Sequence, residues 1–130
     1  MTVVVGYIPN QYGEAALSAG LAEARHRGSD VLVVNATKGD ALVDQKYLGE
    51  HAAAELTKRL ESESDVSTEV RQTIAADVAS EIVRIAEEVS ASLIVIGVRR
   101  RSPVGKMFMG SVAQQVLLDA TVPVLAVKPD

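Results

Sequence analysis

The chain has 130 residues, of which 48% are hydrophobic and only 3% aromatic, and its formal net charge is −4. This length predicts a single domain, residues 1–130, with enough chain to bury a core, and the composition requires aliphatic side chains to build that core. The acidic balance disfavours a general binder of nucleic acids or anionic membranes. There is no cysteine, which excludes disulfides, thiolate metal sites and cysteine nucleophiles.

No segment of the sequence predicts targeting or membrane insertion. The first residues, MTVVVGYIPN, lack a charged region and are too short for a signal peptide. No apolar run approaches the length of a transmembrane helix. We therefore expect a cytoplasmic protein without a membrane partner.

The first half of the chain predicts two buried strands, each followed by a helix. Residues 2–8 (TVVVGYI) and 30–36 (DVLVVNA) are β-branched and apolar, as expected of strands buried on both faces. Apolar side chains recur at helical spacing over residues 14–26 and 47–61. The polar segment 37–46 between the second strand and the second helix is long enough to fold over a site.

The second half predicts three more strands and two more helices. Residues 68–74 (TEVRQTI) alternate polar and apolar, which predicts a strand near a sheet edge. Asp77 is placed to cap the next helix. The apolar run SLIVIG, residues 92–97, predicts a central strand, residues 112–120 the last helix, and residues 122–128 the last strand.

Strands and helices therefore alternate along the chain, which predicts an α/β, Rossmann-like, doubly wound parallel sheet of five strands with helices on both faces. In the strand order 3-2-1-4-5, a ligand crevice would lie between the strands that end at Ile8 and Gly97. Pro123 places the last strand at an edge of the sheet. The low charge of residues 122–128 favours a homodimer through this strand.

The segment from Gly97 to Ser111 carries most of the recognisable chemistry. It joins the central strand to the last helix, where Ser111 and Gln114 have the spacing of a capping box. Three consecutive arginines, residues 99–101, lie between them. Free backbone N–H groups at a helix start favour phosphate, and nearby cations strengthen that preference. We therefore predict the ligand site here.

Two common nucleotide motifs do not fit this segment. Gly97 lies eight residues before Gly105 instead of the spacing that a Walker A loop requires, and Met107 stands where that loop needs Ser or Thr. The first strand is not followed by a GxGxxG pattern either.

The pattern Gly97-x2-Arg100-x9-Gly110-Ser111 resembles the universal stress protein family, whose nucleotide-binding members carry Gly-x2-Gly-x9-Gly-Ser/Thr between the fourth strand and the last helix. The similarity covers the whole chain and is most specific in DVASEIVRIAEEVSASLIVIG and GSVAQQVLLDATVPVLAVK. It implies a stress-response sensor or regulator that binds ATP or AMP. The residues implied at the nucleotide are Gly6, Tyr7, Ile8 and Ala36 at the base, and Gly97, Arg99, Arg100, Gly110, Ser111 and Val112 at the ribose and phosphates.

Two positions depart from the family's pattern. Arg100 replaces the second glycine, so its side chain either obstructs the phosphate site or adds a charge-assisted hydrogen bond. Ile8 replaces an Asp and removes a carboxylate for the nucleotide or for the magnesium that would accompany ATP; Asp40 or Asp44 would have to supply it. The alternative function is a family member that binds no nucleotide and acts through its dimer and other protein–protein contacts.

Catalysis is not expected beyond slow ATP hydrolysis. The sequence shows neither a nucleophile–base pair nor a convergent carboxylate pair, and His26 and His51 lack partners at metal-ligand spacing. A nucleotidyl-transfer or hydrolytic enzyme on the same fold is the third candidate. We expect no nucleic-acid partner; without a ligand, the arginines would form only a solvated charged turn.

Overall fold

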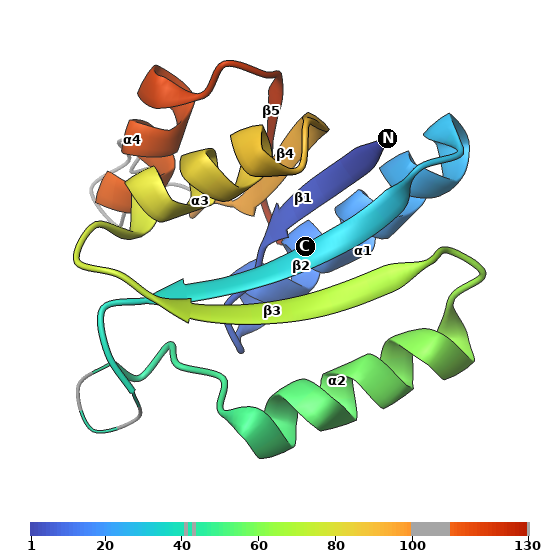
Figure 1. Cartoon of the computed structure of the whole chain (residues 1–130), viewed down its shortest axis with the longest axis horizontal. Coiled ribbons are helices and arrows are strands. Elements are labelled where there is room, and N and C mark those ends of the chain that lie inside the picture. Colours follow the sequence, from blue (N-terminus) through green and yellow to red (C-terminus); the bar gives the residue numbers. More distant parts are fainter. Residues whose placement is uncertain (41, 43, 100–109, 130) are drawn as a thin grey trace.

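The computed structural model describes residues 1–40, 42, 44–99 and 110–129, and strands and helices alternate along them (Figure 1). None of the described helices combines the length and the apolar character that a membrane span requires. In chain order the elements are β1 (Thr2–Gly6), α1 (Gln11–Arg27), β2 (Asp30–Thr37), α2 (Glu50–Glu63), β3 (Thr68–Ile74), α3 (Val78–Glu88), β4 (Ala91–Gly97), α4 (Ser111–Asp119) and β5 (Val124–Val127).

The sheet has the predicted order, β3-β2-β1-β4-β5, and all its strand pairs are parallel. Strand β1 lies at the centre, where Val4 is in register with Leu32 of β2 and Ile94 of β4. Strands β3 and β5 form the two edges, as predicted. The α/β doubly wound fold is therefore confirmed.

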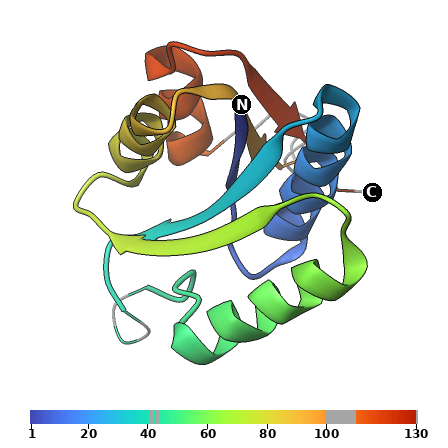
Figure 2. The same ribbon diagram turned by 45° about the vertical axis from the view of Figure 1, so that its right-hand side comes forward.

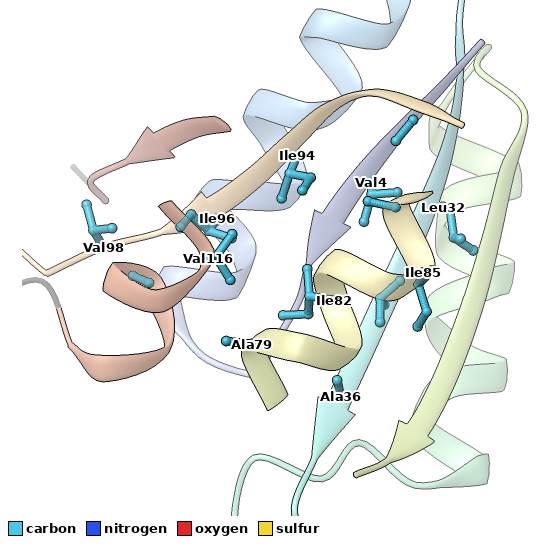
Figure 3. Packing of buried hydrophobic residues seen from close by; sticks show 14 residues of the cluster. Val4, Leu32, Ala36, Ala79, Ile82, Ile85, Ile94, Ile96, Val98 and Val116 are labelled. Atoms are coloured by element: carbon cyan, nitrogen blue, oxygen red, sulfur yellow. The ribbon is translucent and has the colours of Figure 1, made fainter. Parts of the chain in front are cut away.

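Two aliphatic cores pack on the two faces of the sheet. Helices α3 and α4 cover one face, where Ile82, Ile85 and Val116 pack against Val4 and Ile94 (Figure 3). Helices α1 and α2 cover the other face (Figure 2). Successive residues of a strand point to opposite faces, so β1 places Val4 in one core and Val3 and Val5 in the other.

Helix starts differ in how they are capped. The side chain of Asn10 accepts hydrogen bonds from the first turn of α1, and Asp77 accepts one from Ser80 N–H at 3.1 Å, which confirms the predicted cap of α3. The capping box predicted at the last helix is wrong. Its N-cap residue is Gly110, one position earlier than predicted, and no side chain among the described residues caps this helix.

The start of α1 packs tightly against the ends of β1 and β4. A Cβ atom at Gly97 would lie 2.2 Å from the carbonyl oxygen of Tyr12, and one at Gly13 would lie 1.7 Å from that of Ile8. Only glycine fits at such an approach. These contacts hold the loop after β1 beside the end of β4.

Candidate functional site

A cavity of about 530 Å³ opens at the carboxyl ends of β1, β2 and β4. It lies where the strand order reverses between β1 and β4, as predicted for a doubly wound sheet. Its volume falls within the usual range of small-molecule sites. Nine residues predicted at the site line it: Gly6, Tyr7, Ile8, Ala36, Gly97, Arg99, Gly110, Ser111 and Val112. The tenth, Arg100, lies outside the described residues.

The start of α4 forms one end of this cavity. Gly110, with φ +81° and ψ 151°, leads into the helix, and the first three helical residues, Ser111 to Ala113, line the cavity. Gln114 N–H donates to the carbonyl of Gly110 at 3.1 Å, so the preceding N–H groups have no partner within the helix. The positive end of the helix dipole therefore lies at the cavity.

The opposite end of the cavity has two cationic side chains that the sequence did not identify. Lys38 follows β2, and Lys46 lies near the end of the segment that was predicted to fold over a site. With Arg99, they give the described lining three cations, against one carboxylate, Asp44.

The carboxylate of Asp44 binds the backbone N–H groups of both lysines. Its Oδ2 accepts the backbone N–H of Lys38 at 3.2 Å, and its Oδ1 accepts that of Lys46 at 2.9 Å. These bonds, the one from Lys46 foremost, hold the pKa of Asp44 below its usual value. Asp40 is exposed and accepts a hydrogen bond from Leu42 N–H, so only Asp44 of the two predicted candidates lines the cavity.

The side chain of Asn35 holds the loop that carries Lys46 through hydrogen bonds. The side chain is fully buried, and its Nδ2 donates to the carbonyl oxygens of Tyr7 and Lys46, both at 2.9 Å. Its Oδ1 accepts from Leu48 N–H at 2.9 Å and from Gln72 Nε2 at 2.8 Å. The sequence signal was an amide within the otherwise apolar run DVLVVNA, because buried amides need partners.

The Tyr7 side chain belongs to the layer of α1 and α2. Its ring packs in that core, and its hydroxyl donates to the carboxylate of Glu14, which also accepts from Arg59 Nη2 at 3.0 Å. Burial and the bond to Glu14 raise the pKa of Tyr7 to about 12. Tyr7 lines the cavity, but its hydroxyl is already engaged.

The described residues contain no cluster of three or more His, Cys, Asp or Glu side chains that could hold a metal ion. His26 and His51 are both exposed, as predicted, and His51 lies 3.1 Å from Glu55 on the same helix.

Comparison with known proteins identifies relatives over nearly the whole chain. The model of the universal stress protein family matches residues 1–128. A universal stress protein of Mycolicibacterium smegmatis is 42% identical over 127 residues, which cover 98% of this chain and 97% of the relative.

Solved structures of universal stress proteins from Archaeoglobus fulgidus share the fold. One has a TM-score of 0.74 at 31% identity, covering 98% of this chain and 97% of its own. Another, in complex with dAMP, has a TM-score of 0.67 at 27% identity, covering 98% of this chain and 96% of its own.

Proposed function

This chain belongs to the universal stress protein family, and from that premise we propose that it binds an adenine nucleotide, ATP or AMP, in the cavity between β1 and β4. The start of α4 carries this proposal. Its first turn, which no described side chain caps, presents backbone N–H groups and a positive dipole end to a cavity that Arg99 also lines. This combination suits phosphate.

The rest of the cavity suits the nucleoside. Ile8, Ala36, Val78 and Ile82 give this cavity an apolar part of its lining. An adenine ring stacked there would bury apolar surface, which is the main source of affinity in small-molecule sites. The relative from Archaeoglobus fulgidus in complex with dAMP supports the same ligand class.

The donor set of the cavity does not fit a magnesium ion. Magnesium prefers carboxylates together with phosphate oxygens, but Asp44 is the only carboxylate among the described lining residues. Both of its oxygens already accept backbone N–H groups, and two lysines flank it. In this proposal, cations and backbone N–H groups compensate the charge of the nucleotide without a bridging metal.

Nucleotide binding would regulate a stress response through the surface next to the site. Helix α4 begins at the cavity and contacts β5, the edge strand through which we propose that the protein forms a homodimer in the cytoplasm. The exposed fraction of Leu118 on α4 is 72%, and that of Leu125 on β5 is 36%. A ligand that orders the start of α4 would thereby act on the dimer surface.

The second candidate function is that the protein acts through contacts with other proteins and binds no nucleotide. Ile8 favours this function. This apolar side chain lines the cavity where nucleotide-binding relatives usually have a carboxylate.

Calorimetric titration with AMP and ATP distinguishes the two functions, using Gly110→Val with Gly28→Val as its matched control. Both glycines have positive φ, and a Cβ at either meets no atom of the described residues within 4 Å, so both variants add backbone strain without a clash in that part of the chain. Gly28 caps the far end of α1. We expect Gly110→Val to remain folded and lose the nucleotide, and Gly28→Val to keep it. Equal affinity in both variants would remove the start of α4 as the site.

A further inference from the structure

We propose that the cavity contains a second anion subsite, formed by Lys38 and Lys46. The ligand that fits best is then an adenosine bisphosphate, with one phosphate at the 5′ position of the ribose and another at its 3′ position. This inference rests on the proposed nucleotide function and names the ligand class of the same cavity.

The two cationic ends of the cavity are separated by the central strand. Lys38 follows β2, whereas Arg99 and the start of α4 follow β4, and β1 lies between these strands in the sheet. Neighbouring strands are about 4.8 Å apart, so the two ends are separated by about 10 Å at the level of the sheet. Figure 1 shows the loop after β2 and helix α4 on opposite sides of the end of β1. A phosphate held at the start of α4 therefore lies on the far side of β1 from the loop that carries the lysines.

The lysine end is held in place before any ligand binds. The carboxylate of Asp44 accepts the backbone N–H groups of both lysines. The buried amide of Asn35 donates to the carbonyl of Lys46 at 2.9 Å, which fixes this loop to the end of β2. Such anchoring lowers the entropy that a ligand would otherwise have to remove on binding.

The ammonium groups at this end are available to an anion. Neither lysine forms an ion pair with a carboxylate in the described part of the chain. Two carboxylates lie near these ammonium groups, Asp44 and Asp77, and backbone hydrogen bonds, with a further contribution from Lys38, lower the pKa of both. Both carboxylates accept backbone N–H groups, so neither occupies a lysine in an ion pair. A lysine binds phosphate as a flexible point charge, so the pair suits a phosphate on the ribose, away from α4.

The test compares AMP with adenosine 3′,5′-bisphosphate by calorimetry in the presence of EDTA. The proteins are the native chain, the double variant Lys38→Gln/Lys46→Gln, and the control Lys58→Gln, whose exposed lysine lies on α2 and does not line the cavity. In the native chain and the control, we expect the bisphosphate to bind about tenfold more tightly or better, as for one hydrogen-bonded charge. In the double variant this preference should disappear.

Equal affinity of the two ligands for the native chain would overturn the subsite and leave the proposed nucleotide function intact. A preference that survives in the double variant would also overturn it. If neither ligand binds the native chain, the proposed function fails and the subsite fails with it.

Discussion

Replacing Asn35 by aspartate tests the buried link between the end of β1 and the cavity loop. The variant keeps the oxygen that accepts hydrogen bonds from Leu48 and Gln72. It places a second oxygen where Nδ2 now donates to the carbonyl oxygens of Tyr7 and Lys46, both at 2.9 Å. An ionised carboxylate would therefore face two acceptors in a fully buried position.

The loss of stability in Asn35→Asp should be large and should depend on pH. Each of the two carbonyl oxygens left without a donor costs about 1–3 kcal/mol, which is a large part of a typical stability of about 5–15 kcal/mol. Burial and the two carbonyls raise the pKa of the new carboxyl above its usual value of about 3.9. The unfolded state therefore ionises first, and the stability deficit grows by about 1.4 kcal/mol per pH unit from that pH up to the pKa of the folded state.

Urea unfolding at pH 4 and pH 7 measures this deficit, with Asn10→Asp as the control. Asn10 is exposed at the N-cap of α1, where its side chain accepts from the N–H groups of Tyr12 and Gly13 and where aspartate caps equally well. The control should stay close to the native chain at both pH values. Native stability of Asn35→Asp at pH 7, or an equal deficit at the two pH values, would refute the hydrogen bonding described for Asn35.

Other predictions test the packing, the ionisation and the metal independence of the site. Gly97→Ala should lower the free energy of unfolding in urea by about 1–3 kcal/mol, as for other overpacked positions, because its Cβ would lie 2.2 Å from the carbonyl oxygen of Tyr12; unchanged stability would contradict this close approach. In an ultraviolet titration one tyrosine should ionise near pH 12, and Tyr7→Phe should remove that transition. Because unfolded tyrosine ionises near pH 10, the stability contributed by Tyr7 should fall as the pH rises from 10 towards 12. If all tyrosines of the native protein ionised near pH 10, the bond from Tyr7 to Glu14 would be excluded. EDTA should leave the calorimetric affinity for AMP unchanged, whereas its loss would show that a metal takes part.

The sheet was predictable because its signals are local and repeated. Wholly apolar runs such as VVV and LIVI predict strands covered on both faces, and their alternation with helical periods implies parallel crossovers. The site followed from the same reasoning. Residues far apart in sequence, such as Ile8 and Gly110, meet because the carboxyl ends of parallel strands share one edge.

Element ends were less predictable because tertiary contacts decide them. Helix α2 was expected from residue 47, since Leu48 starts its apolar stripe, but it begins at Glu50. The backbone N–H groups of Leu48 and Gly49 donate instead to Asn35 and Gln72.

Other ends also differ from the prediction, and β1 ends at Gly6 instead of residue 8. Helix α1 begins at Gln11 instead of residue 14, because Asn10 caps it before the apolar period becomes visible. Strand β5 covers only Val124–Val127, within the predicted 122–128, because only these residues pair with β4.

The lysine end of the cavity could not be predicted in detail. The segment 37–46 has no periodicity that would indicate which side chains face inward. Its course depends on hydrogen bonds that the carboxylate of Asp44 accepts and on one that the distant Asn35 donates, and only the folded chain brings these groups together.

Titration of the native chain with AMP, after any bound nucleotide has been removed by unfolding and refolding, tests the central claim most directly. Mass spectrometry of the released material identifies what the protein carried. The account predicts saturable binding heat with one AMP per chain, and adenine nucleotide in the released fraction. No heat with AMP or ATP and no released nucleotide would contradict it, and would show that the cavity at the start of α4 does not bind an adenine nucleotide.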